Sequence, residues 1–325
     1  MMISRRDMGL GLGMVLTTPM IGRAQTPLEQ AANALPQLHA IIVQRGDVQV
    51  LAHAPRGPGL ARPANIKSCS KSLLSLLVGA AIAQGAIPGV SARLGDIAPR
   101  LVPPDATEGA AALSIDNLLT MRTGLAGTSG ANYGAWVESR NWISYVLRQP
   151  RIGPPGAQMT YSTGTTHVLG AALTTATGDS LLTLSRRWLG EDLGIQIAPW
   201  TRDPQGFYFG GNEMALTPQA MLRIAIMMRD GGRYDGRQVI TPDWVRAATR
   251  PHTRSPYSGL AYGYGWFLSP SGWHLARGYG GQIIAAHPGR ALAVAITSDP
   301  TQPARSEGYF GDLMRLLDGP ILGLA

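Results

Sequence analysis

The alternation of apolar and polar positions predicts strands at both ends of the chain and helices between them. Residues 38–44 and 48–53 are rich in β-branched residues and are joined by a short turn, which predicts a hairpin. Near the other end, four short runs separated by turn residues are β-compatible, and an amphipathic helix is expected after them. These runs cover residues 265–268, 273–278, 282–287 and 292–297, and the helix covers 305–317.

The middle of the chain shows helical rather than strand periodicity. Residues 68–84 are apolar on nearly every face beyond the first turn, so this segment predicts a helix buried inside the protein and ended by Gly85. Further helices are expected between loops rich in glycine and proline. They cover residues 115–121, 142–148, 165–193, 217–229 and 242–249.

Strands at both ends and helices between them predict an α+β fold. One antiparallel sheet, flanked by helices, would be built from both termini, with a mainly helical lobe inserted. We expect a single domain over residues 25–325, with an α/β part at about 25–100 and 255–325 and the helical lobe at about 101–254. The cleft between the two parts is the expected place for a ligand.

Residues 1–24 resemble a twin-arginine export signal. Arg5 and Arg6 precede an apolar stretch from Met8 to Met20, and small residues flank Arg23 before Gln25. The stretch is short for a membrane span, so we expect no stable membrane anchor and a periplasmic or secreted mature protein.

Composition narrows the function classes. The net charge is +8, and it falls by two to +6 when three arginines and one aspartate of the signal are removed. The basic residues are scattered, without a basic run or an aromatic-interleaved stripe, so nucleic-acid binding is not expected. The single cysteine, Cys69, excludes an intramolecular disulfide and is expected to face the core.

Only two of the 28 basic residues are lysines, Lys67 and Lys71. Lysine can act as a proton acceptor when it is desolvated, whereas arginine stays charged. Lys71 follows Ser68 by three residues at the start of the buried helix, so both side chains would share one face and Lys71 could take the hydroxyl proton. Lys67 precedes the helix and is expected to be a rim charge.

Two further segments complete a family pattern. Residues 115–125 and Pro155-Gly156 are followed by Tyr161-Ser162-Thr163, and Tyr279-Gly280-Gly281 comes late in the chain. With Ser68-x-x-Lys71, this order resembles the serine β-lactamase and penicillin-binding-protein superfamily, in particular the class C β-lactamase-like hydrolases and esterases.

The resemblance implies the roles of the site residues. Ser68 would be the acylated nucleophile, and Lys71 and Tyr161 would act as general base and relay protons. The resemblance does not say which of the two is the base in acylation. The backbone N–H groups of Ser68 and Gln282 would form the oxyanion hole. No metal and no cofactor are implied.

Two departures from the family pattern concern the substrate. Thr163 replaces an asparagine, and Tyr279 replaces a lysine or histidine, so the usual grip on a substrate carboxylate is expected to be lost. Tyr279, Gly280 and Gly281 then favour an exported serine hydrolase for small esters or amides. The alternatives are a true β-lactamase or D-Ala-D-Ala carboxypeptidase, and a catalytically silent ligand-binding protein on the same fold.

Aromatic loop residues are candidates for the rim of the substrate site. Trp136 lies in a glycine-rich insertion, and Tyr208 lies in a second loop that ends in two glycines. Such loops suit a mobile rim around an apolar acyl group, and local packing of the helical lobe is an equal alternative. The sequence does not predict the oligomeric state.

Overall fold

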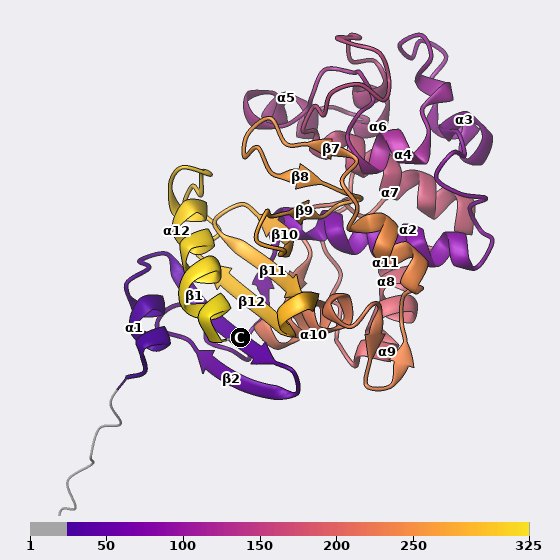
Figure 1. The fold of residues 1–325 in the computed structure, drawn as a ribbon. Coiled ribbons are helices and arrows are strands. Elements are labelled where there is room, and N and C mark those ends of the chain that lie inside the picture. Colours follow the sequence, from indigo (N-terminus) through magenta and orange to yellow (C-terminus); the bar gives the residue numbers. More distant parts are fainter. Residues whose placement is uncertain (1–24, 325) are drawn as a thin grey trace, which may run out of the picture.

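The protein is built around one eight-stranded antiparallel sheet (Figure 1). The computed structural model describes residues 25–324, so the predicted export signal lies outside the described residues. The strand order is β2-β1-β12-β11-β10-β9-β8-β7. The strands are β1 (Leu38–Arg45), β2 (Val48–His53), β7 (Thr253–Arg254), β8 (Ala261–Tyr262), β9 (Phe267–Leu268), β10 (His274–Gly278), β11 (Gln282–His287) and β12 (Leu292–Ser298).

The sheet joins the two ends of the chain, as the sequence predicts. β1 pairs with its hairpin partner β2 on one side and with the last strand, β12, on the other. β12 continues through β11 to β10. The antiparallel sheet flanked by helices confirms the predicted fold class.

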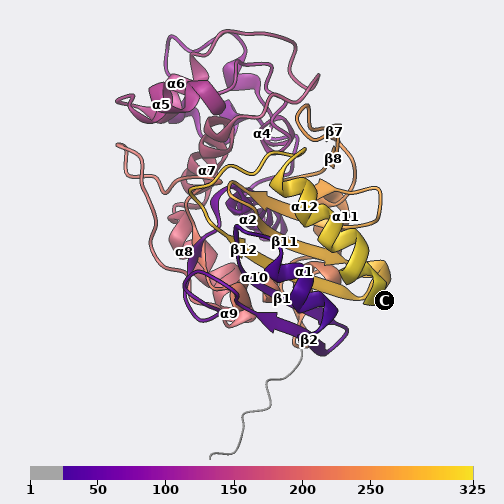
Figure 2. The same cartoon turned by 90° about the vertical axis from the view of Figure 1, so that its left-hand side faces the viewer.

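The two faces of the sheet carry side chains of different size. On β12, Leu292, Val294 and Ile296 face α1 (Pro27–Asn33) and α12 (Tyr309–Leu316). Ala293 and Ala295 face the opposite side, where α2 (Ser70–Ala83) and α10 (Pro218–Arg229) lie. Because successive residues of a strand point to opposite faces, this alternation of large and small side chains lets α10 approach the sheet closely (Figures 1 and 2).

The helical lobe lies beside the sheet and is reached through α2 (Figure 2). Several of its helices begin at side-chain caps: Ser114, Asn141 and Ser162 accept hydrogen bonds from first-turn N–H groups of α4, α6 and α7. The helices of this region are α3 (Leu94–Ile97), α4 (Ile115–Leu119), α5 (Tyr133–Val137), α6 (Trp142–Leu147) and α7 (Thr163–Thr177).

The long helix predicted over 165–193 is divided into pieces. α7 ends at Gly178, whose φ of 74° is left-handed, and Ser180 caps the next helix, α8 (Leu181–Ser185). A π-helical turn at Arg186–Gly190 then leads to α9 (Glu191–Leu193). Glycine readily adopts positive φ, so it ends a helix that apolar periodicity alone would continue.

The expected boundary between sheet and lobe differs from the structure in one respect. α10 lies within the range expected for the helical lobe, yet it packs against β11 and β12. α11 (Pro242–Ala248) follows and contacts α2. Two short ribbons, β3 (Ala64–Asn65) with β4 (Ala215–Leu216) and β5 (Arg233–Tyr234) with β6 (Arg237–Gln238), complete the strands of the described residues.

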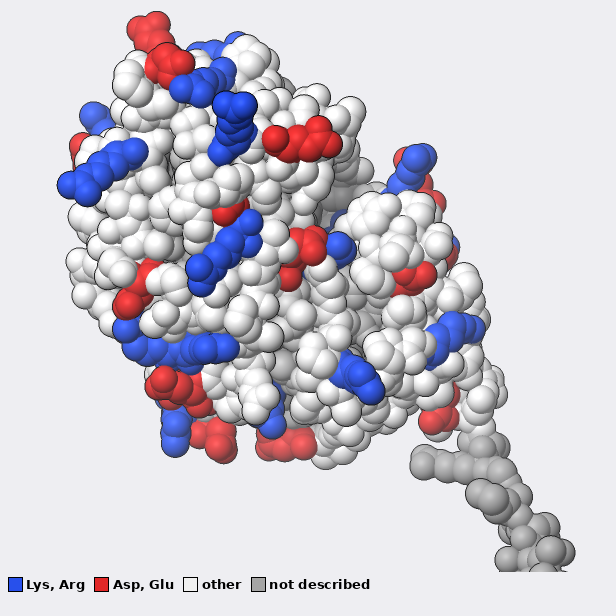
Figure 3. All heavy atoms as spheres, turned by 180° about the vertical axis from the view of Figure 1, so that it is seen from behind, with Lys and Arg blue, Asp and Glu red and all other residues white. Residues whose placement is uncertain are grey.

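Basic and acidic side chains alternate over the face seen in Figure 3, and no continuous basic stripe crosses the described part of that face. Within residues 25–324, none of the helices combines the length and apolar character needed to cross a membrane.

Candidate active site

Ser68 lies on a 3-10 turn, Lys67–Cys69, directly before α2. The preceding residue, Lys67, has a φ of 49°, a left-handed conformation that is costly for a residue with a side chain. Two hydrogen bonds hold it there: its N–H donates to Asn65 at 2.9 Å, and its carbonyl accepts from the Ser70 hydroxyl at 2.6 Å. The half-buried Ser68 side chain is therefore presented by a fixed backbone.

The ammonium of Lys71 is buried beside the Ser68 hydroxyl. Lys71 Nζ lies 3.1 Å from Ser68 Oγ, 3.3 Å from Thr163 Oγ1 and 3.0 Å from the carbonyl oxygen of Gly211. Burial lowers the pKa of Lys71 to about 7. A substantial fraction of Lys71 is thus neutral near pH 7 and able to accept a proton.

Thr163 occupies the position that the resemblance gives to an asparagine. It begins α7, is 4% exposed, and lines the cavity in front of Ser68. Besides its contact with Lys71, its hydroxyl lies 3.0 Å from Ser129 Oγ, which also accepts a hydrogen bond from the Thr163 N–H at 2.8 Å. Thr163 therefore positions Lys71 as well as lining the substrate site.

Tyr161 meets the same two residues. Lys71 Nζ lies 5.1 Å from the centre of the Tyr161 ring, and the tyrosine is hydrogen-bonded to Ser68. Burial raises the pKa of Tyr161 to about 12, while the hydrogen bond with Ser68 opposes the rise. The structure thus brings Ser68, Lys71 and Tyr161 together, with Lys71 the easier group to deprotonate.

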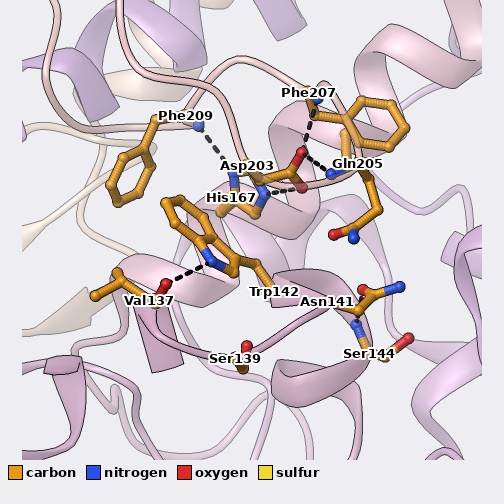
Figure 4. A network of polar contacts seen from close by, with 12 residues as sticks. Val137, Ser139, Asn141, Trp142, Ser144, His167, Asp203, Gln205, Phe207 and Phe209 are labelled. Carbon is orange, nitrogen blue, oxygen red and sulfur yellow. Dashed lines mark hydrogen bonds and ion pairs between the residues drawn. The ribbon is translucent and has the colours of Figure 1, made fainter. Parts of the chain in front are cut away.

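A buried polar network fixes the loop that supplies the Gly211 carbonyl (Figure 4). His167 Nε2 lies 2.9 Å from Asp203, and His167 Nδ1 accepts a hydrogen bond from the Gly210 N–H at 3.2 Å. Asp203 also accepts the N–H groups of Gln205 and Phe207. Fully paired buried networks rigidify their surroundings, so this network positions the partner of Lys71.

A cavity of about 950 Å³ opens in front of Ser68. Its walls come from the 3-10 turn, the segment 129–133, the start of α7, the end of β10 and the segment 300–310. The Tyr279 side chain lines it and is 51% exposed. Across residues 25–324, no cluster of three His, Cys, Asp or Glu side chains has the arrangement of a metal site.

The structure places the predicted oxyanion donor Gln282 away from the cavity. Gln282 lies on β11 opposite Gly278 and is fully buried. Its side-chain amide is used by Ser298, donating to the Ser298 carbonyl at 2.8 Å and accepting the Ser298 N–H at 3.1 Å. The cavity is lined instead by Arg277, Gly278 and Tyr279, at the end of β10.

Gly280 and Gly281 also do not line the cavity, contrary to the sequence-based expectation. A Cβ atom on Gly280 would lie 2.3 Å from the carbonyl oxygen of Asp299, and one on Gly281 would lie 2.4 Å from the Tyr309 ring. Both glycines thus permit tight packing of the turn after β10. The glycine that approaches the nucleophile segment is Gly278, where a Cβ would lie 2.2 Å from the carbonyl oxygen of Ile66.

Trp136 and Tyr208 are not at the rim of the cavity, so local packing was the correct interpretation. Trp136 is fully buried, and its indole N–H donates to the Trp142 carbonyl at 3.0 Å. Tyr208 is 4% exposed, packs on Trp200 and accepts a hydrogen bond from Arg202 at 2.8 Å.

None of the charged residues that line the cavity was predicted as a site residue; Lys67 and Arg277 are two of them. Lys67 lines it and forms an ion pair with Glu213 at 3.0 Å, so it is more than a solvated rim charge. Arg277 lines it from β10. An arginine inside the β-compatible run 273–278 was the sequence signal for Arg277.

Cys69 packs in the core next to the site. Its thiol is fully buried and lies 3.4 Å from the Gln282 carbonyl oxygen. Burial raises the pKa of this thiol, so the inert, apolar role expected from the sequence fits its surroundings.

Solved structures share this architecture. A protein from Bacillus anthracis, named as a proposed 6-aminohexanoate-dimer hydrolase, has a TM-score of 0.77 and 16% identity, with 93% of this chain and 83% of that chain covered. EstCE1, a hydrolase with promiscuous acyltransferase activity, has a TM-score of 0.74 and 17% identity over 90% and 97%. A penicillin-binding protein homologue from Caulobacter crescentus has a TM-score of 0.67 and 18% identity over 84% and 92%.

At these identities the likeness concerns the fold. No curated protein matches the sequence closely enough to count as a relative. A model of the protein family described as Beta-lactamase, however, matches residues 27–317, which is most of the chain. Together with the site built around Ser68, Lys71 and Tyr161, this match shows that the chain belongs to the Beta-lactamase family of serine hydrolases.

Proposed function

We propose that this chain is an exported serine hydrolase that cleaves an ester or amide bond through an acyl-enzyme on Ser68. The observation that carries the proposal is the distance of 3.1 Å between Lys71 Nζ and Ser68 Oγ in front of a cavity large enough for a small substrate. A nucleophile and a proton acceptor within hydrogen-bonding reach are the first requirement for acyl transfer.

Acylation begins when Ser68 Oγ attacks the substrate carbonyl carbon. Neutral Lys71 accepts the hydroxyl proton as the new C–O bond forms, because its pKa of about 7 makes it a better base than Tyr161. The carbonyl oxygen becomes an oxyanion, which the Ser68 N–H can stabilise. Since Tyr279 rather than Gln282 lines the cavity, the Tyr279 N–H is the better candidate for the second donor.

The intermediate then collapses and the leaving group departs with a proton. Tyr161 is positioned to relay that proton from Lys71, since it contacts both Lys71 and Ser68. In the second half of the reaction, water attacks the acyl carbonyl carbon and gives its proton back through the same groups. The products are a carboxylic acid and free Ser68.

Small esters and linear amides are the proposed substrates. Thr163 stands where β-lactam-recognising relatives carry an amide, which argues against β-lactams as the main substrates. The neighbours named as a 6-aminohexanoate-dimer hydrolase and as a hydrolase with acyltransferase activity support this choice on the same fold. Turnover of nitrocefin, or of a D-Ala-D-Ala peptide, well above that of p-nitrophenyl esters would favour the alternative.

Export remains a proposal from residues 1–24. Replacing Arg5 and Arg6 together by lysine should retain the protein in the cytoplasm of a host with a twin-arginine pathway, whereas the unchanged chain should reach the periplasm. Equal distribution of both versions between cell fractions would contradict export by this route.

The hydrolase proposal is tested by labelling with a fluorophosphonate and mapping the adduct by mass spectrometry. We expect one adduct on Ser68, none in Ser68→Ala, and loss of ester hydrolysis in the same variant. Absence of an adduct together with unchanged activity in Ser68→Ala would reject the proposal. If Ser68→Ala changed neither hydrolysis nor ligand affinity, the silent binding protein would be the better reading.

A further inference from the structure

The guanidinium of Arg277 lies in the cavity without a polar partner. It stands over the Phe310 ring at 3.9 Å and near the Phe267 ring at 5.3 Å, measured to the ring centres. Within residues 25–324, no ion pair and no side-chain hydrogen bond involves it. Both phenylalanines line the cavity with Arg277.

A largely buried guanidinium without a partner is unusual. It carries five N–H donors, and burying a charge is costly unless a partner compensates it. Burial lowers the pKa of Arg277 to about 10, so the group stays charged at neutral pH. Phenyl rings against its face compensate part of the cost and leave the N–H edge free to bind a planar anion.

Arg277 is also close to the reacting groups. It directly precedes Gly278, which packs against Ile66 two residues before the nucleophile. Its charge acts on Tyr161 and lowers the pKa of that hydroxyl, against the larger effect of burial. An anion bound by Arg277 would therefore lie in the same cavity as a carbonyl carbon held at Ser68.

Arg277 is the cation deep in the cavity whose charge is not balanced by an acidic side chain of the described residues. Lys67 is paired with Glu213, and Asn65 donates a further hydrogen bond to Glu213 at 2.6 Å. Arg305 and Glu307 carry opposite charges and are both exposed. Added negative charge is therefore favoured next to Arg277.

We propose that Arg277 binds a carboxylate of the substrate, so that this hydrolase prefers esters or amides that carry a carboxylate near the scissile bond. The proposal rests on the proposed hydrolase activity at Ser68. The sequence pattern led us to expect that no cation binds a substrate carboxylate, because Tyr279 replaces a lysine or histidine. We propose instead that Arg277, two residues earlier, supplies this cation.

The test compares paired substrates in the full-length mature enzyme. Mono-p-nitrophenyl glutarate and p-nitrophenyl butyrate differ by a carboxylate on the acyl side, and 3-acetoxybenzoate and phenyl acetate differ by one on the leaving group. In one of the pairs, the ratio of kcat/KM for the anionic over the neutral substrate should fall by about 10-fold or more in Arg277→Gln, the size expected for one charge-assisted hydrogen bond. An unchanged ratio in both pairs would overturn the proposal.

Arg305→Gln is the matched control, because it removes an equal charge from the exposed mouth of the same cavity. Its ratios should stay within about threefold of those of the unchanged enzyme, the effect of a screened surface charge. If the ratio fell equally in Arg277→Gln and Arg305→Gln, only the overall electrostatic field of the cavity would favour anionic substrates. That result would overturn direct binding by Arg277. Arg277→Lys should recover only part of the ratio, since an ammonium cannot bind a carboxylate with two parallel N–H groups.

Fluorophosphonate labelling separates this proposal from the one on which it rests. If Ser68 is labelled in both the unchanged enzyme and Arg277→Gln and the ratios are equal, the hydrolase proposal stands and carboxylate binding fails. If Ser68 is not labelled in the unchanged enzyme and Ser68→Ala keeps full activity, the hydrolase proposal itself fails. Circular dichroism and thermal unfolding of each variant show whether a loss comes from misfolding.

Discussion

The backbone carbonyl of Gly211 accepts a hydrogen bond from the Lys71 ammonium at 3.0 Å. This contact needs the absence of a side chain, since a Cβ on Gly211 would lie 2.6 Å from Thr166 Oγ1 and 2.8 Å from Lys71 Cγ. The φ of 82° adds a second reason for glycine. Lys71, the proposed proton acceptor, is thus held in place by a backbone position that only glycine fits.

Gly211→Ala is expected to lower kcat/KM by about 10- to 100-fold, because displacing Lys71 by a fraction of an ångström misaligns it with Ser68. Gly206→Ala is the control: Gly206 has a φ of 91°, but a Cβ there meets nothing within 4 Å. Both variants should lose stability in thermal unfolding through backbone strain. Equal turnover in the two variants would show that Gly211 does not position Lys71.

Lys71→Arg should lower kcat/KM by about 1000-fold or more, because a guanidinium stays protonated and cannot accept the Ser68 proton. Lys67→Arg keeps the charge that pairs with Glu213 and should cost less than about fivefold. Steady-state hydrolysis of a neutral p-nitrophenyl ester measures both. An equally small loss in Lys71→Arg would mean that Lys71 acts through its charge alone.

The activity of the enzyme should rise with pH through the pKa of Lys71, which is about 7. The neutral amine is the active form of the proposed base, so kcat/KM should increase about tenfold per pH unit well below 7 and level off above it. Tyr161, with a pKa of about 12, stays protonated over this range and adds no second limb. A kcat/KM profile between pH 5 and 10 that is flat, or falls, would contradict Lys71 as the base.

Thr163→Val should lower kcat/KM by about 10-fold, because it removes the hydroxyl that lies 3.3 Å from Lys71 and 3.0 Å from Ser129 while keeping the shape. Thr163→Ser keeps the hydroxyl and should retain most of the activity. Kinetics and thermal unfolding of the pair separate positioning from stability. If Val and Ser were equally active, Thr163 would be a wall of the cavity and no more.

Much of the fold followed from local signals. The hairpin at β1 and β2, the buried helix at Ser68 and the strands β10 to β12 are all marked by periodicity and turn residues in the sequence. Where a glycine interrupts a continuing apolar pattern, as at Gly178, periodicity overran the helix end. The position of α10 on the sheet depends on tertiary packing, which no local pattern encodes.

The candidate catalytic group was predicted for a different reason: Ser68 and Lys71 carry chemistry that few residue types can perform, and the family resemblance added Tyr161. The third element was less certain, because the run Gly278-Tyr279-Gly280-Gly281 offers several glycines for one close approach. Only contacts across the fold identify Gly278 as the residue next to Ile66. Whether Trp136 packs in the core or lines the cavity also depends on tertiary contacts, since aromatic residues occur in protein cores and at the rims of binding sites.

The pairing of β1 with β12 has a consequence for folding during synthesis. Because β1 lies between its hairpin partner β2 and β12, which ends at Ser298, the sheet cannot close until the ribosome has synthesised the chain beyond Ser298. β10, which completes the cavity, is attached to the same late strands. A chain that stops before these strands would carry Ser68 and Lys71 without the strand that completes the cavity, so the proposed hydrolysis would require synthesis through β12.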